Sequence, residues 1–245
     1  MIDCFPFFNE LDLLEVRLNA LAPYVDRFIL AEGEKTYSGH PKPLFFADNR
    51  ERFADFNITH VVTPSLEGGP WELECWGRQC LLENLGPVTA DEIILISDVD
   101  EIPDLAGYEG AEGVFEHDYF YRYFDCSNGV KWRGTFAVRE HHLSKHYTRA
   151  RLRKWLKRRL PVVGGGWHFT SLGSVENFIY KLEAYAHQEL NTAENKARVR
   201  EEARDVAKWI GLHGLSVEPP SGPAWLLENR ARYPDLFLAP AGGTP

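Results

Sequence analysis

Two aspartates and a glutamate follow a strongly apolar, strand-like segment of the chain. Residues 92–96 (Glu-Ile-Ile-Leu-Ile) have the composition of a strand buried on both faces, and Asp98, Asp100 and Glu101 come next, before Pro103. In an extended segment Asp98 and Asp100 point to the same side, because side chains alternate. Neighbouring carboxylates repel one another unless a cation joins them, and Mg²⁺ and Mn²⁺ bind oxygen ligands that they often share with phosphates. The pattern predicts a metal–diphosphate site; the alternative is a solvated acidic turn.

The elements that must position these carboxylates alternate between strand and helix. The spacing of apolar residues predicts, in order, strand 2–5, helix 10–21, strand 27–31, strand 58–62, helix 71–85 and strand 92–96. Asn9 is expected to cap the first helix. This alternation predicts an α/β fold with a mostly parallel central sheet flanked by helices, in which ligands lie beyond the carboxyl ends of the strands.

The second half of the chain has a different character. Aromatic residues fill 113–125 and a strand-like run covers 132–140, with Asn128-Gly129 between them. This pattern predicts an aromatic β-hairpin laid against the sheet. Further helices are expected toward the C-terminus, over 148–160, from a cap at Ser174, and over 192–210.

The composition is that of a globular protein with one large core: 245 residues, 44% hydrophobic and 26% charged. We interpret residues 1–215 as a single domain and 216–245 as an extended Pro/Gly-rich tail, packed on it or trailing from it. A net charge of −9 disfavours nucleic acid as a partner, because basic surface carries most of the affinity for DNA. Basic side chains are concentrated in 149–159, which predicts a solvated face or a mobile lid over the diphosphate. The alternative is a contact with an anionic acceptor such as lipid phosphate, a teichoic-type polymer or DNA.

Sorting signals are not apparent in the sequence. No apolar run approaches the roughly 18 residues that a membrane span requires, and residues 1–6 show no signal-peptide pattern. The four cysteines form no C-x-x-C pair. We therefore expect no transmembrane segment, reduced thiols and a cytoplasmic location.

Three blocks of the sequence, in order, resemble glycosyltransferase family 17, the family of β-1,4-mannosyl-glycoprotein N-acetylglucosaminyltransferases. They are residues 2–39, which begin Ile-Asp-Cys-Phe-Pro-Phe-Phe-Asn-Glu, residues 96–103, which contain Asp-Val-Asp, and residues 166–189, which begin Gly-Trp-His-Phe. The resemblance implies the nucleotide-sugar-binding α/β fold called GT-A, an Asp-x-Asp metal site and inversion at the anomeric carbon. Without a membrane anchor and stem, we expect a bacterial or phage member whose acceptor differs from that of the animal enzymes.

The resemblance, with the order of the elements, assigns roles to particular residues. Asp98, Asp100 and His168 are expected to bind Mn²⁺ or Mg²⁺, with contact to the donor as the alternative for Asp98. Residues expected to bind the donor share positions near strand ends or on the helix before the metal strand: Glu32, Thr36, Lys42, Arg78, Asp98 and Trp167. An inverting transfer also needs a general base. The candidates are Asp125, at the tip of the aromatic hairpin, and Glu101, beside the metal.

These features together predict a metal-dependent, inverting glycosyltransferase. We expect it to move a sugar, GlcNAc in the first instance, from a UDP-sugar to a hydroxyl of a glycan, a glycoprotein or another acceptor. One alternative is a transferase that uses another nucleotide sugar and acts on phage DNA or virion protein. The other is a carbohydrate-binding protein that has the same fold and no turnover.

Overall fold

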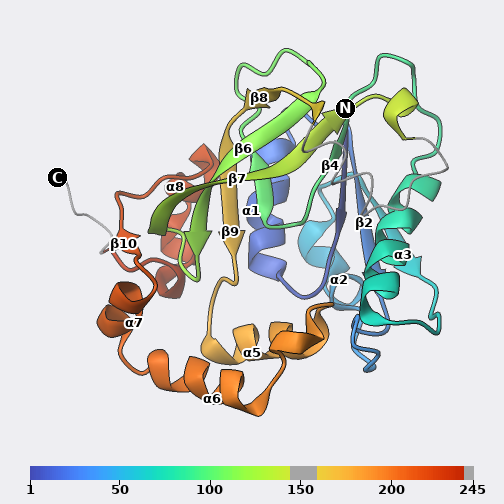
Figure 1. The fold of residues 1–245 in the computed structure, drawn as a ribbon. Helices are drawn as coiled ribbons and strands as arrows, with labels where there is room; N and C mark the ends of the chain where they lie inside the picture. Colours follow the sequence, from blue (N-terminus) through green and yellow to red (C-terminus); the bar gives the residue numbers. More distant parts are fainter. Residues whose placement is uncertain (144–158, 240–245) are drawn as a thin grey trace.

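The computed structural model describes residues 1–143 and 159–239, and within them the strands form one ten-stranded sheet (Figure 1). The order of its main path is β3-β2-β1-β4-β7-β6-β9-β5, and β10 and β8 join β7 and β6 respectively. The strands are β1 (Ile2–Pro6), β2 (Arg27–Gly33), β3 (Ile58–Thr63), β4 (Ile94–Ile96), β5 (Glu101–Pro103), β6 (Gly113–Tyr121), β7 (Cys126–Val138), β8 (Val162–Gly164), β9 (Gly166–Thr170) and β10 (Ser216–Val217). The α-helices are α1 (Leu11–Leu21), α2 (Phe45–Asp48), α3 (Pro70–Glu83), α5 (Val175–Ala184), α6 (Ala193–Glu202), α7 (Val206–Leu212) and α8 (Ala224–Glu228).

The first half of the sheet is parallel, as the alternation of strands and helices predicts. β1 pairs in parallel with β2 and with β4, and β2 pairs in parallel with β3. The carboxyl ends of these four strands therefore meet at one edge of the sheet. The α/β class is confirmed, and this edge is where the Asp98–Asp100 loop emerges from β4.

Alternate residues of the central strands enter different hydrophobic clusters. Ile2 and Cys4 of β1 belong to a cluster that includes Cys80 of α3. Phe5 of β1 belongs to the other cluster, with Leu14 of α1. Because side chains of a strand alternate between its two faces, α1 and α3 cover opposite faces of the parallel strands (Figure 1).

The aromatic hairpin forms, but it lies within the sheet and not against it. β7 pairs antiparallel with β4 on one side and with β6 on the other, which makes the whole sheet mixed. The predicted turn at Asn128-Gly129 is wrong, because the chain reverses between β6 and β7 at residues 122–125. Asn128-Gly129 instead forms a local irregularity inside β7, where Gly129 has a φ of 71° and the Asn128 side chain accepts a hydrogen bond from the Val130 N–H.

Two predicted helix boundaries also change. Asn9 does not cap α1: the residue before the helix is Glu10, whose carboxylate accepts hydrogen bonds from the N–H groups of Phe8 and Asn9. The helix expected over 192–210 is two helices, α6 and α7, because Asp205 caps α7 by accepting a hydrogen bond from the Lys208 N–H. The cap at Ser174 is confirmed, with the Asn177 N–H as its donor.

Residues 216–239 pack on the domain. They contain β10, α8 and two 3₁₀ turns, η4 (Arg230–Arg232) and η5 (Pro234–Leu236). Leu226, Tyr233 and Phe237 are buried in the same hydrophobic cluster as α1. These apolar side chains explain why residues 216–239 do not remain an extended tail.

The basic helix expected over 148–160 lies almost entirely outside the described residues. Within the described part of the chain, no helix has the length and apolar composition needed to cross a lipid bilayer.

Candidate active site

A cavity of about 490 Å³ opens at the carboxyl ends of the parallel strands, a volume suited to a ligand of nucleotide size. Its walls come from the residues that follow β1, β2, β3 and β4, and from α3 and α5. Asp98 and Asp100 both line it. The structure thus places the two aspartates beside a ligand-sized space, where the topology of a parallel sheet predicts a binding site.

Asp98 pairs with an arginine of α3. The Arg78 Nη2 atom lies 2.5 Å from Asp98 Oδ1 and 3.1 Å from Glu74 Oε1. Burial lowers the pKa of Arg78, but the charges of Asp98 and Glu74 outweigh it and raise that pKa above its usual value. The Asp98 side chain remains 30% exposed, so the pair faces the cavity with a surface that a ligand can reach.

Asp100 lies between a lysine and a histidine. Its Oδ2 atom is 3.4 Å from Lys181 Nζ of α5, and its Oδ1 atom is 3.5 Å from His168 Nε2 of β9. Burial raises the pKa of Asp100, but the neighbouring charges of Lys181 and His168 lower that pKa overall. Burial lowers the pKa of His168, but the negative charge of Asp100 raises that pKa overall. His168 reaches Asp100 because β9 pairs with β5, with His168 opposite Glu101.

A fully buried arginine of α1 holds the backbone of the aspartate loop. The Arg17 guanidinium contacts Asp3 through Nε (2.8 Å) and Nη2 (2.6 Å), and Nη2 also donates to the Ser97 hydroxyl. Its Nη1 donates to three carbonyls of the loop, those of Asp98 (3.0 Å), Val99 (3.3 Å) and Glu101 (2.8 Å). Arg17 therefore fixes the path of residues 97–101 from inside the protein.

The position of Glu101 argues against its predicted role as general base. Its side chain is fully buried and does not line the cavity. Its carboxylate accepts hydrogen bonds from Trp132 Nε1 at 2.7 Å and from the Asp98 N–H at 2.9 Å. Gly134 leaves room for it, since a Cβ there would lie 2.7 Å from the Glu101 carboxyl carbon. Glu101 orients Trp132, which does line the cavity, and one end of the aspartate loop.

Comparison with known sequences identifies the family. The sequence model of glycosyltransferase family 17 matches residues 1–211, most of the chain. The chain belongs to glycosyltransferase family 17. Relatives of this family-17 protein include the β-1,4-mannosyl-glycoprotein 4-β-N-acetylglucosaminyltransferases of Homo sapiens and Rattus norvegicus, each 32% identical over 110 residues. The match covers 39% of this chain and 20% of each relative, so the chain spans about a fifth of the length of these relatives.

Solved structures show a more distant similarity to the family-17 chain. Crystal structures of S. aureus TarS 1-349, alone and in complex with UDP, match with TM-scores of 0.38 and 0.40. The sequence identities are 13% and 14%, and the matches cover 81% of this chain and 67% and 68% of those chains.

The residues predicted to bind the donor near β2 fall into two groups in the family-17 structure. Thr36 and Lys42 line the cavity, whereas Glu32 lies behind it. Glu32 is 1% exposed and its carboxylate contacts Lys42 Nζ (3.3 Å), His60 Nε2 (3.2 Å) and the Phe46 N–H. Burial lowers the pKa of Lys42, and the charge of Glu32 opposes this effect. Glu32 is thus placed to position Lys42, which lines the cavity although its side chain is only 3% exposed.

Two predicted site residues lie away from the cavity. Asp125 is fully buried, and its carboxylate accepts hydrogen bonds from the N–H groups of Leu238 (2.9 Å) and Ala239 (2.8 Å). This arrangement argues against Asp125 as general base, because its oxygens hold the C-terminal segment. Trp167 is the neighbour of His168 in β9, and alternation along the strand directs it away from Asp100. Its Nε1 instead donates to the Ser221 hydroxyl at 3.3 Å.

Arg17 and Lys181 are the residues of the site to which sequence patterns gave no role. Arg17 lies in the helix 10–21 among apolar residues, where a charged side chain is ordinarily expected on the solvent face. Lys181 belongs to a block that resembles the family, but nothing local indicates contact with Asp100, 81 residues away in sequence. A charged residue within an apolar helical stripe was the available signal for Arg17.

Proposed function

We propose that this chain is a metal-dependent, inverting glycosyltransferase that moves a sugar from a UDP-sugar to an acceptor hydroxyl. UDP-GlcNAc is the donor that we propose first, because the human and rat relatives are named as N-acetylglucosaminyltransferases. The acceptor is a hydroxyl of a glycan, a glycoprotein or another molecule.

One observation carries the proposal: carboxylates and cationic side chains line the same cavity. Asp98 and Asp100 are among the carboxylates, and Lys42, Arg78 and Lys181 are among the cations. A nucleoside diphosphate brings negative phosphates that cations attract, and a divalent ion brings positive charge that carboxylates attract. An enclosed site with both kinds of group is suited to a metal–diphosphate complex.

Asp100 and His168 offer two neighbouring ligand atoms that suit a divalent metal ion. Asp98 and Asp100 offer carboxylate oxygens, and His168 Nε2 lies 3.5 Å from Asp100 Oδ1. Oxygen ligands with one imidazole nitrogen suit Mn²⁺, and an all-oxygen set completed by phosphate and water suits Mg²⁺. When bound, the ion supplies positive charge that stabilises the departing diphosphate. Asp100 and His168 would hold the ion, and Asp98 would hold the ion or a donor hydroxyl.

The protein's own groups account for donor binding. Arg78 and Lys181 flank the two aspartates and provide fixed positive charge for the phosphate oxygens, because each side chain is oriented by an ion pair with the loop. Trp132, oriented by Glu101, presents an aromatic surface on which a sugar ring can stack. The general base is best sought among the carboxylates that line the cavity, such as Glu10 and Glu34.

Release of nucleoside diphosphate tests this function. The intact chain is incubated with UDP-, GDP- and TDP-sugars, once with Mn²⁺ and once with EDTA. We expect slow release of UDP from one UDP-sugar with Mn²⁺ and none with EDTA, because water can replace a missing acceptor.

A binding protein on the same fold gives the opposite pattern. It would bind a sugar equally well with Mn²⁺ and with EDTA, and it would release no nucleotide from any donor. Such a result would exclude the proposed transferase activity.

A further inference from the structure

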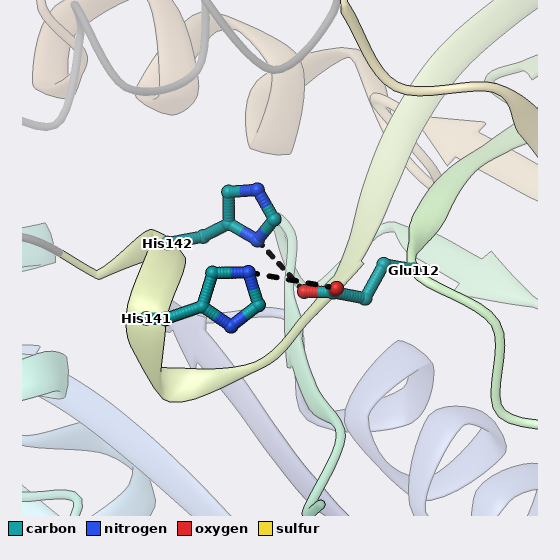
Figure 2. A group of neighbouring side chains, drawn as sticks. All are labelled: Glu112, His141 and His142. Atoms are coloured by element: carbon teal, nitrogen blue, oxygen red, sulfur yellow. Dashed lines mark hydrogen bonds and ion pairs between the residues drawn. The ribbon is translucent and has the colours of Figure 1, made fainter. Parts of the chain in front are cut away.

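A second polar cluster lies at the other end of the sheet, and it combines one carboxylate with two imidazoles. Glu112 directly precedes β6, and His141 and His142 belong to a 3₁₀ turn, η2 (Glu140–His142), that follows β7. The pairing of Gly113 in β6 with Ala137 in β7 brings the two segments together. Figure 2 shows both imidazoles directed at the Glu112 carboxylate.

The distances in this cluster are close to those of a metal site. His142 Nδ1 lies 2.7 Å from Glu112 Oε1, and His141 Nε2 lies 3.7 Å from Glu112 Oε2. One potential ligand atom from each of the three residues lies within 4.8 Å of the others. Tetrahedral Zn²⁺ with bonds of about 2.0–2.1 Å places its ligand atoms about 3.3 Å apart. Small side-chain rotations would reach that spacing, and the His141 side chain is 63% exposed and can rotate easily.

The surroundings of Glu112 support its role as a ligand and also limit the affinity. The Arg139 N–H donates to Glu112 Oε1 at 2.7 Å and so orients the carboxylate. Arg139 Nη1 lies 3.4 Å from Oε2, and its charge competes with a bound cation. Glu112 and His142 are each 19% exposed, which leaves an open side where water can complete the coordination.

This cluster is separate from the proposed donor site. Val138, which immediately precedes the Arg139–His142 segment, pairs with Ile94 at the start of β4. Asp98 and Asp100 follow Ile96, at the other end of the same strand. A metal ion at each end of β4 would therefore occupy independent sites.

We propose that Glu112, His141 and His142 form a binding site for Zn²⁺ or a similar borderline transition-metal ion. Two histidines and a glutamate are a three-residue ligand set that zinc uses when it keeps a position open for water. The ion joins the start of β6 to the turn after β7. Its binding energy therefore stabilises that junction and contributes to folding.

Titration with Co²⁺ and Zn²⁺ tests the site. The protein carries Asp98→Asn and Asp100→Asn, which silence the proposed donor site, and Co²⁺ is added because its visible absorption reports tetrahedral coordination. We expect one equivalent of Co²⁺ to bind and Zn²⁺ to displace it. Glu112→Gln, His141→Gln and His142→Gln should each weaken binding at least 10-fold.

A matched control is His213→Gln. His213, which directly follows α7, pairs through Nε2 with one carboxylate only, that of Glu202 in α6 at 3.1 Å, so its loss should leave Co²⁺ affinity unchanged. The proposal is overturned if no Co²⁺ or Zn²⁺ binds, or if binding survives all three substitutions at the cluster. His141→Gln keeps the test decisive if another variant misfolds, because that side chain is largely exposed.

Discussion

Two arginine–aspartate pairs hold the same loop from opposite sides, and they differ in what remains available to a ligand. In the Arg17–Asp3 pair both side chains are completely buried, and all three guanidinium nitrogens have partners within the protein. In the Arg78–Asp98 pair the side chains are 11% and 30% exposed and line the cavity. The buried pair fixes the backbone of residues 97–101, whereas the open pair presents charge to the cavity. The same two residue types thus serve architecture in one place and, in our proposal, donor binding in the other.

The largest expected effect is on stability, when the buried pair is disrupted. Arg17→Met leaves the Asp3 carboxylate and three loop carbonyls without their donor in a buried site. We expect the free energy of unfolding to fall by about 3–5 kcal/mol, because a buried charge without its partner is strongly destabilising. Urea unfolding measures the difference.

Arg133→Met is the surface control for Arg17→Met. Arg133 pairs with Glu116, and the two side chains are 47% and 35% exposed, so the loss should be below about 1 kcal/mol. Equal losses of unfolding free energy in Arg17→Met and Arg133→Met would show that the buried Arg17–Asp3 pair is no more important to stability than a surface pair.

The next effect is on turnover and concerns the open side of the loop. Asp100→Asn removes a charge from the proposed metal site without changing the size of the side chain. We expect UDP release at saturating donor to fall on the order of 100-fold or more, since electrostatic stabilisation in enclosed sites contributes effects of that size. The chain should still unfold cooperatively in urea, because Arg17 holds the loop independently of Asp100.

Asp104→Asn provides the matched control for that measurement. Asp104 is an exposed aspartate shortly after the same loop, and its carboxylate accepts a hydrogen bond from the Ala106 N–H. Its turnover should stay within about twofold of the wild type, a factor worth roughly 0.4 kcal/mol. Similar losses from both substitutions would show that general acidity of the loop, and not Asp100, is what matters.

Lys181 offers a smaller and more specific perturbation of the open side. Lys181 neutralises Asp100 in the ligand-free protein, so it competes with a divalent ion for that carboxylate. Lys181→Met should raise the Mn²⁺ affinity of the ligand-free protein about 10-fold, equivalent to about 1.4 kcal/mol, while UDP affinity falls. Isothermal titration with Mn²⁺ and then with UDP separates the two effects.

Lys196→Met is the control, because Lys196 pairs with Glu183 and not with Asp100. Its Mn²⁺ affinity should match that of the wild type. If Lys181→Met lowered Mn²⁺ affinity or left it unchanged, Lys181 would not be the resident counter-charge of Asp100.

Local patterns of residues account for what the sequence could predict. Periodicity alone predicts β1, β2, β3, β4 and α1, because each is a local pattern of apolar residues. Both aspartates after β4 line the cavity, but Val99 lines it too and Val99 and Asp100 form a turn, so strand alternation is not what brings the two side chains there. The resemblance to the family adds His168, which lies beside Asp100.

Long-range contacts account for the predictions that failed. Asp125 follows an aromatic strand and suggested an exposed hairpin tip, but residues 238 and 239, more than 110 positions later, cover it. Asn128-Gly129 has the residue types of a tight turn but forms an irregularity within β7. The hairpin reverses elsewhere because β7 pairs with both β4 and β6. Arg17 meets carbonyls more than 80 residues away, which no local pattern encodes.

A third charged cluster is intermediate in burial, and its contribution to stability should depend on pH. Glu15 of α1 contacts Arg52, Arg232 and the Tyr233 hydroxyl, which ties the C-terminal segment to the domain. Burial raises the pKa of Glu15, but hydrogen bonds from Arg52 and Tyr233 and the charges of both arginines lower it overall. A carboxyl whose pKa is lower in the folded state contributes stability above its unfolded pKa, near 4.5, and loses it as the pH falls through the folded pKa.

Glu15→Gln should therefore destabilise the protein by about 1 kcal/mol at pH 7, near the upper end for partly exposed pairs. The difference from wild type should shrink as the pH is lowered below 4.5, because the wild-type carboxyl then takes up a proton. Urea unfolding at several pH values measures both changes, and Glu176→Gln, which breaks an exposed pair with Arg200, should leave the unfolding midpoint unchanged. A difference that stayed constant with pH would mean that Glu15 acts through packing and not through its charge. The cluster would then not be comparable with either arginine–aspartate pair.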